Sequence, residues 1–274
     1  MSDPQLSGEP ISEAEALQRL RQTEDPSQRY YAAWWLGRMR SRHPDAVPLL
    51  LSSLSLALCE SQDVASADDL FVARNAARAL GKLQAPSALT MLLQALEHPD
   101  HDLREAAARS IGELGDPMAI PALSRRLQQP RAAEPTGQGV RLNEPCEALL
   151  EALGDLSRGQ QNEELLTLIE PFSHHERPVL RSSALRALLM ISGEERWANA
   201  LMALLKHEQL QVRRAVLMDV GACGWRPAGP ALANCLAENS LKLIALKGLV
   251  EQPLQQQENQ SEEKELLQLM DDLL

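Results

Sequence analysis

The sequence predicts an all-α protein built as an α-α superhelix, that is, a solenoid of stacked helix pairs. Leucine and alanine dominate a composition that is 44% hydrophobic but only 3% aromatic, and both residues are strong helix formers. Threonine, a strand-favouring residue, occurs only four times in the 274 residues. One short template also recurs along most of the chain, which predicts a repeat protein whose units pack only on their neighbours.

The first helix of each pair follows this template. It reads apolar, polar, two variable residues, a small apolar residue, three more residues, an apolar residue and often glycine, and it is clearest from Leu103 and Arg104 to Gly112. The predicted first helices cover residues 29–37, 72–81, 103–112, 145–154, 180–189, 212–221 and 241–250.

A second apolar helix follows each first helix after a short turn. Proline often begins it, because the N–H that proline lacks has no partner in a first helical turn. Two insertions lengthen the repeat, an acidic one over 59–69 and one over 129–143 that is rich in proline and glycine. Such insertions usually form loops, often functional ones. The predicted second helices cover 48–58, 86–96, 119–127, 163–172, 197–205 and 227–236.

Both ends of the chain differ from the repeats. Residues 12–21 predict a capping helix that starts with Ser12 and Glu15, a capping-box pattern. Residues 252–260 are rich in glutamine and predict a linker, and 262–274 predict a short acidic helix. The expected organisation is therefore an acidic N-terminal segment with a capping helix (1–28), a solenoid (29–250), and an acidic tail or capping helix (251–274).

The net charge of −11 lies mostly at these two ends. Residues 1–28 hold six acids and two bases, and residues 251–274 hold seven acids and one base. No run of lysine and arginine is long enough to follow a phosphate backbone, so no nucleic-acid partner is expected. The first residues lack a signal-peptide pattern, no apolar stretch approaches a membrane span, and the four cysteines lack CxxC spacing. These features predict a cytoplasmic protein with reduced thiols and no membrane contact.

Aromatic residues break the template at one place, in the first repeat. Counting from the polar residue of the template, positions +3 and +7 are apolar throughout and predict the core stripe. Positions +1 and +5 are mostly charged in the other repeats, but here they hold Tyr30 and Trp34. Positions +2 and +6 are mostly small in the other repeats, but here they hold Tyr31 and Trp35. Two interpretations remain open. In the first, the 12–21 helix covers the rings, and this applies mainly to Tyr31 and Trp35. In the second, the rings form a binding surface, and this applies mainly to Tyr30 and Trp34.

The segment Tyr-Tyr-Ala-Ala-Trp-Trp-Leu-Gly over 30–37 carries a resemblance to a known family. Together with Arg-Ala-Leu-Gly over 78–81 and Ala-Arg-Ser-Ile-Gly-Glu-Leu-Gly-Asp-Pro over 108–117, it resembles the E (alpha) subunit of the E/F-type phycobilin lyases of cyanobacteria and red-algal plastids. These are HEAT-like repeat proteins, and the resemblance spans roughly residues 12–250. The aromatic motif is more specific than the repeats, which occur in many unrelated proteins.

The resemblance implies an enzyme that works as a heterodimer with a homologous F subunit. Such a pair binds a linear tetrapyrrole, usually phycocyanobilin, and attaches it by a thioether bond to a cysteine of a phycobiliprotein alpha subunit, as in phycocyanin. Bilin would be a bound substrate, with no prosthetic group. Related pairs use phycoerythrobilin or isomerise the pigment with a His-Cys motif on the F partner, and no His-Cys pair occurs in this chain.

The chemistry of a bilin suggests which residues would bind it. The target protein supplies the thiol, so this chain would position the pigment, protonate it and exclude water. Flat rings suit Tyr30, Tyr31, Trp34 and Trp35, and an Asp or Glu of the first two repeats, not identified further, would face the pyrrole nitrogens. Arginines would bind the two propionates, with a structural role as the alternative for each. The candidates are Arg38, Arg74, Arg78, Arg104 and Arg109.

Other kinds of function have little support in the sequence. His98, Asp100, His101 and Asp102 lie in an inter-repeat turn and show no zinc-ligand spacing, so no metal site is expected. Phosphate-binding glycine loops and nucleophile-elbow motifs are absent. Two alternatives stay open: a non-catalytic scaffold for protein interactions, and a pigment-detaching or chaperone-like member of the same family.

Overall fold

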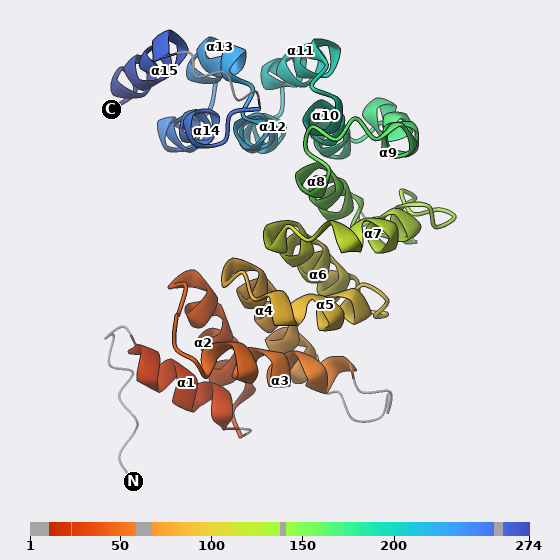
Figure 1. Cartoon of the computed structure of the whole chain (residues 1–274), viewed down its shortest axis with the longest axis vertical. Helices are drawn as coiled ribbons and strands as arrows, with labels where there is room; N and C mark the ends of the chain where they lie inside the picture. The colour runs from red at the N-terminus through yellow and green to blue at the C-terminus, as the bar shows by residue number, and fades with distance from the viewer. Residues whose placement is uncertain (1–10, 23, 59–66, 138–140, 255–259) are drawn as a thin grey trace. The chain divides into compact units, whose positions relative to one another are not determined.

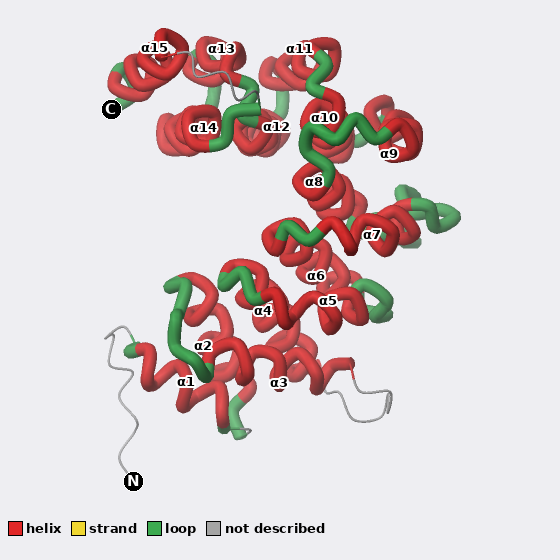
Figure 2. The backbone as a smooth tube through the Cα atoms, in the orientation of Figure 1, coloured by secondary structure: helices red, strands yellow, loops and turns green. Residues whose placement is uncertain are grey.

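The computed structural model describes residues 11–22, 24–58, 67–137, 141–254 and 260–274, and within these it is helical with turns and a single isolated bridge (Figure 2). The predicted all-α class, built from pairs of helices, is therefore confirmed. The helices are α1 (Glu13–Arg21), α2 (Pro26–Arg38), α3 (Ala46–Leu58), α4 (Ala67–Lys82), α5 (Leu89–Ala95), α6 (His101–Leu114), α7 (Ile120–Leu127), α8 (Cys146–Leu156), α9 (Glu163–Ile169), α10 (Pro178–Ser192), α11 (Glu195–Ala203), α12 (Leu210–Cys223), α13 (Gly229–Ala233), α14 (Asn239–Glu251) and α15 (Gln260–Asp271).

Contacts divide the chain into two compact units, Met1–Leu114 and Gly115–Leu274. In the first unit, α2 packs on α4 and α4 on α6, α3 packs on α4, and α1 covers α2 (Figure 1). In the second unit, α8, α10, α12 and α14 form the corresponding row, and α15 packs on α13 and α14. No helix in the described ranges is both long and apolar enough to cross a membrane.

Several second helices begin as a 3-10 turn, which the sequence did not predict. These turns are Pro86–Ala88, Pro117–Ala119 and Arg226–Ala228, which directly precede α5, α7 and α13. Proline is the first residue of the first two turns and the second residue of the third. Helix α4 begins at Ala67, inside the region expected to be an insertion. The described residues do not include the rest of that insertion (59–66, with Cys59). They also leave out the first ten residues and most of the 252–260 linker.

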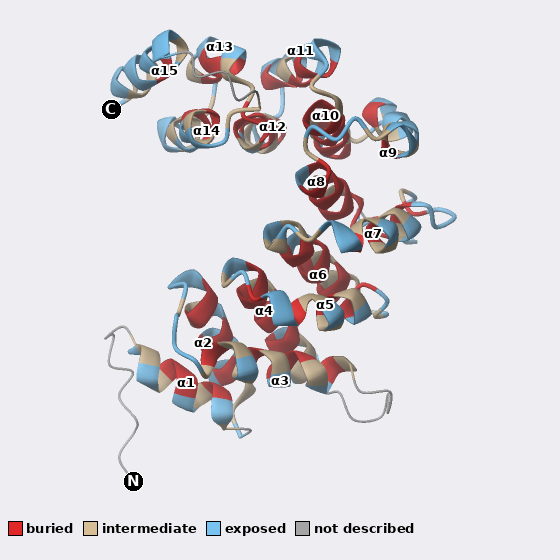
Figure 3. Ribbon diagram, viewed as in Figure 1, coloured by how far each residue is buried: buried red, intermediate tan, exposed pale blue. Residues whose placement is uncertain are grey.

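The core stripe of the first helices lies as predicted. Positions +3 and +7 are at most 1% exposed in every repeat where they were predicted (Figure 3). Position +6, by contrast, packs against the preceding first helix: a Cβ placed on Gly81 would lie 2.7 Å from the Cα of Ser110, and one on Gly37 would lie 2.7 Å from the Cα of Ala79. Glycine at the end of one first helix therefore lets the next approach closely. The first repeat has no preceding repeat, only α1, which leaves room for large rings there.

A buried charged network joins α8, α10 and α12 in the second unit. Arg186 donates to both Asp155 carboxylate oxygens at 2.9 and 3.0 Å and lies 3.5 Å from Asp219 and 3.8 Å from Glu151. The Ser182 hydroxyl donates to Asp219 at 2.5 Å. Burial raises the pKa of Asp219 to about 6, and the negative charge of Glu151 adds to this effect, whereas Arg186 and the Ser182 hydroxyl oppose it.

This raised pKa predicts a pH-dependent effect of Asp219→Asn. The folded pKa lies above the unfolded one, so the protonated carboxyl contributes stability that is complete below about pH 4 and is lost as pH rises through about 6. Asparagine removes that dependence. Between pH 4.5 and pH 7, the free energy of unfolding of the variant should improve relative to wild type by about 2 kcal/mol. Urea unfolding at the two pH values measures this, and an unchanged difference would contradict it.

Candidate functional site

Helix α2 positions the aromatic motif. Asp25 caps its N-terminus by accepting hydrogen bonds from the backbone N–H groups of Ser27 and Gln28 at 2.9 and 3.1 Å, and Pro26 occupies the first turn. The side chain of Asn75 on α4 donates to the carbonyl of Tyr30 at 3.2 Å, which fixes the register between the two helices. This hydrogen bond joins α2 and α4, which pack side by side.

Three of the four predicted rings remain exposed although α1 packs on α2. Tyr30, Tyr31 and Trp34 are 45%, 40% and 43% exposed, and Trp35 is half-buried. The Tyr31 and Trp34 rings stack with their centroids 5.4 Å apart, so the contact is between residues i and i+3 rather than within the i, i+4 pairs of the template. Exposed aromatic surface at this density is uncommon on a soluble protein and is typical of a binding site.

Phe71 of α4 extends this surface, although the repeat template gave no sign of it. It is 49% exposed, and the Arg74 guanidinium lies 4.9 Å from its ring centroid. A pocket of about 340 Å³ is lined by Tyr30, Phe71 and Asp68 together with Pro26 and Ser27. We call the surface formed by Tyr30, Tyr31, Trp34 and Phe71 the aromatic face. Asp68 therefore places a carboxylate beside it.

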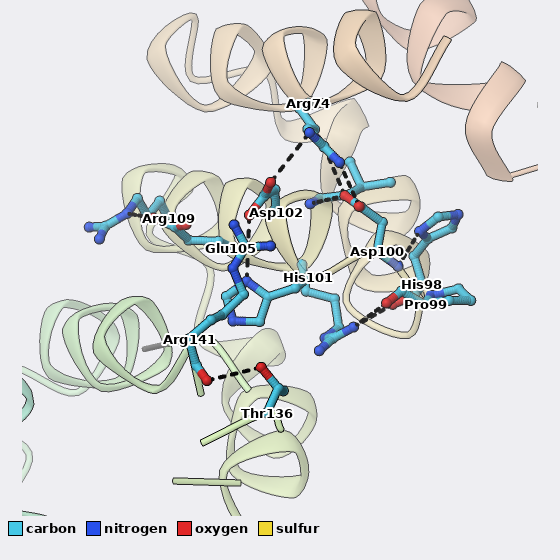
Figure 4. A network of polar contacts seen from close by, with 12 residues as sticks. Arg74, His98, Pro99, Asp100, His101, Asp102, Glu105, Arg109, Thr136 and Arg141 are labelled. Carbon is cyan, nitrogen blue, oxygen red and sulfur yellow. Dashed lines mark hydrogen bonds and ion pairs between the residues drawn. The ribbon is translucent and has the colours of Figure 1, made fainter. Parts of the chain in front are cut away.

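Three of the five predicted arginines have protein partners, and Figure 4 labels two of them, Arg74 and Arg109. Arg74 binds Asp100 through two hydrogen bonds of 2.9 and 2.6 Å and lies 3.3 Å from Asp102, which ties α4 to the start of α6. Arg104 is 7% exposed and donates to two backbone carbonyls of the turn before α6, at 2.9 and 2.8 Å. Arg109 pairs with Glu105 one turn away at 3.1 Å. These contacts support structural roles for the three side chains.

The ion pair between Arg74 and Asp100 also shifts their titration. The hydrogen bond from Arg74 raises its own pKa, and although burial alone would raise the pKa of Asp100, the Arg74 partner outweighs burial and lowers it. Burial lowers the pKa of the neighbouring His98. The ion pair of Arg74 and Asp100, which we call the helix clamp, is therefore charged at neutral pH.

Arg38 and Arg78 differ from the other three. Within the described ranges, neither has a hydrogen bond or an ion pair. Arg78 occupies the template position on α4 that Trp34 occupies on α2, and Arg38 follows Trp34 by one turn on the same stripe of α2. These two guanidinium groups are thus available for an anionic ligand next to the aromatic face.

A possible metal cluster occurs where the sequence predicted none. The ligand atoms of His101, Asp102 and Glu105 lie within 4.8 Å of one another. However, Arg74 lies 3.3 Å from Asp102, and Arg109 pairs with Glu105 at 3.1 Å, so both carboxylates already face a cation. The cluster is explained as part of the helix clamp.

The described cysteines are poor nucleophiles. Burial raises the pKa of Cys146 and Cys223 to about 12 and also raises that of Cys235. All three are buried free thiols. In the described part of the chain, therefore, a covalent cysteine intermediate has no suitable residue.

Two family models match parts of the chain. The model described as "PBS lyase HEAT-like repeat" matches residues 28–55, which include the aromatic motif, and the model described as "HEAT repeats" matches residues 62–137. Together the matched ranges include all or most of each helix from α2 to α7.

Several relatives match this chain over nearly its whole length. The chain is 50% identical to the bilin biosynthesis protein RpcE of Synechococcus sp. (strain WH8020) over 97% of this chain and 96% of that protein. It is 43% identical to the phycocyanobilin lyase subunit alpha of Picosynechococcus sp. (strain PCC 7002), with full coverage of both. Among solved structures, it matches a chain of the complex of CpcE and CpcF of phycocyanin lyase from Nostoc sp. PCC7120 with a TM-score of 0.84, 38% identity, and coverage of 100% of this chain and 99% of that one.

Proposed function

Because this chain belongs to the family of phycocyanobilin lyase alpha subunits, we propose that it is the E-type subunit of a heterodimeric bilin lyase. With an F-type partner it binds phycocyanobilin and attaches it by a thioether bond to a cysteine of the phycocyanin alpha subunit, in the cytoplasm. The observation that carries the proposal is identity of 40% or more over essentially the full length to several such subunits. Fold alone would not carry it, since helical solenoids serve many functions.

The bilin is proposed to lie on the aromatic face. Exposed Tyr30, Trp34 and Phe71 offer flat, rigid, apolar area that stacks on conjugated rings at little entropic cost. Asp68, which lines the same pocket as Tyr30 and Phe71, is the carboxylate proposed to face the pyrrole N–H groups. The sequence predicts such an acid in the first two repeats without identifying it, and the position of Asp68 in this pocket supports this residue.

The reaction needs positioning more than a protein nucleophile. The target cysteine adds across the ethylidene double bond of the bilin: the sulfur forms a bond to the exocyclic carbon, and the thiol proton is balanced by protonation of the adjacent ring carbon. No oxidant or reductant is consumed. Buried cysteines of raised pKa in this chain would not compete with the target thiol. The chain therefore contributes a fixed pigment geometry and a site with less water.

The choice of bilin is the finer part of the proposal. Relatives at 38–43% identity are named for phycocyanobilin, whereas the relative at 50% identity is named only for bilin biosynthesis. That difference keeps phycoerythrobilin as a second candidate substrate.

Reconstitution tests the proposal. The full chain, its F-type partner, apo-phycocyanin alpha subunit and either phycocyanobilin or phycoerythrobilin are combined, and covalent pigment is scored by zinc-enhanced fluorescence on a denaturing gel. We expect covalent pigment only when both subunits are present, and more of it with phycocyanobilin. A stable complex of the two subunits that attaches neither pigment would contradict the proposal and favour a scaffold. Pigment lost from holo-phycocyanin on adding the complex would favour a detaching enzyme.

A further inference from the structure

A basic pocket lies where α2 and α4 end, at the opposite end of these helices from Phe71. It measures about 300 Å³. Three cations line it, Arg38, Arg40 and Lys82, against one carboxylate, Glu113, which gives the pocket a local charge of +2 in a chain whose net charge is −11. Within the described ranges, none of the three cations forms an ion pair. An uncompensated positive pocket on an acidic protein is suited to an anion.

The backbone of two pocket residues is unusual. Arg40 and Gln84 adopt left-handed conformations, with φ of 51° and 48°, directly after α2 and α4. At the equivalent positions after α6 and α12 the chain has Gly115 and Gly224, with φ of 74° and 73°. Glycine adopts this conformation without strain, whereas a residue with a Cβ adopts it at a cost in free energy. Glycine would have a lower conformational free energy at these two positions, but the first two repeats have long polar side chains there. Both side chains line the basic pocket.

The helix dipole explains only part of this arrangement. Arg38 and Lys82 lie in the last turns of α2 and α4, where a cation stabilises the partial negative charge of the helix end. A left-handed Arg40 beyond the helix end is not needed for that purpose. Strained residues persist mainly where function requires the side chain.

We propose that the basic pocket binds carboxylate groups and, resting on the function proposed above, that these are the propionate side chains of the linear tetrapyrrole. Trp34 and Arg38 are one turn apart on the same stripe of α2, about 6 Å along the helix axis, so the pocket continues from the aromatic face. Arginine binds a carboxylate with two parallel hydrogen bonds, which fixes orientation as well as affinity. The rings would lie on Trp34 and Tyr30 while Arg38, Arg40 and Lys82 hold the acid groups.

Equilibrium titration of the complex of this chain with its F-type partner tests the inference with two ligands, phycocyanobilin and its propionate dimethyl ester. Wild type is expected to bind the free acid about tenfold more tightly than the ester. Arg40→Gly should remove most of that preference, leave the affinity for the ester unchanged, and fold at least as well, because glycine suits the backbone there. Arg131→Gly is the matched control, since Arg131 is also left-handed, with φ of 65°, but lies outside the basic pocket.

Each outcome decides between readings. Equal affinity of wild type for acid and ester would overturn the inference without any variant. An Arg40→Gly variant that binds both ligands more weakly by the same factor would also overturn it, because the effect would then be structural. Weaker association with the F-type partner at unchanged bilin affinity would assign the pocket to carboxylates of that protein instead. If the wild-type complex binds neither ligand, the proposed function itself fails.

Discussion

Replacing Tyr30 and Trp34 together with alanine is expected to weaken phycocyanobilin binding by the chain and its F-type partner about thirtyfold. The two side chains are 45% and 43% exposed and project from one stripe of α2, so both rings can contact the faces of a flat ligand. Loss of one aromatic stacking contact costs about 1 kcal/mol, and two such losses give this factor when the remaining surface does not compensate. Absorbance titration measures the dissociation constant.

A matched variant separates this effect from general loss of apolar surface. Leu236→Ala with Ile244→Ala removes two side chains that are 78% and 51% exposed but lie in the second unit. This control should bind the pigment like wild type. Equal weakening in both double variants would assign the effect to nonspecific contacts, and no weakening in either would remove the aromatic face from the site.

Replacing Arg186 with methionine is expected to lower the free energy of unfolding by about 3–5 kcal/mol, because removing one partner leaves buried carboxylates without their cation. Arg186 is 11% exposed and contacts Asp155, Asp219 and Glu151. Burial opposes the charge of Arg186, but these carboxylates outweigh it and raise its pKa. The midpoint of urea unfolding at pH 7 measures the loss.

An exposed ion pair provides the comparison. Arg21 pairs with Asp45, and the two side chains are 50% and 48% exposed. Arg21→Met should therefore cost less than about 1 kcal/mol, because water screens such pairs. If the two arginine variants unfold at the same urea concentration, the network of Arg186 does not stabilise the second unit as described.

The sequence was sufficient to predict the fold because the fold is encoded locally. Apolar residues at +3 and +7 recur within each first helix, and glycine often follows, so their burial can be inferred from one repeat and carried to the next. The same template made the rings of Tyr30 and Trp34 conspicuous, since they occupy positions that are charged elsewhere. Their exposure required the structure, because the sequence could not show how far α1 covers α2.

Contacts between repeats could not be predicted in the same way. Arg74, Arg104 and Arg109 are alike in sequence to Arg38 and Arg78, yet among the residues that the structure describes only the first three have protein partners. For Arg74, that distinction depends on the register of α4 against the turn before α6, about 26 residues away.

Phe71 was missed because it precedes the template copy in α4, directly after a region expected to be a loop. The left-handed backbone of Arg40 had no signal in sequence, because glycine is the usual residue there.

The rate of covalent attachment under single-turnover conditions shows whether the bilin lyase subunit works through its aromatic face. The complex of this chain with its F-type partner, loaded with phycocyanobilin, is mixed with apo-phycocyanin alpha subunit, and covalent pigment is followed in wild type and in the Tyr30→Ala, Trp34→Ala variant. We expect attachment by wild type and a rate at least about tenfold lower in the variant, at equal complex formation. Attachment at the same rate in both proteins would contradict it.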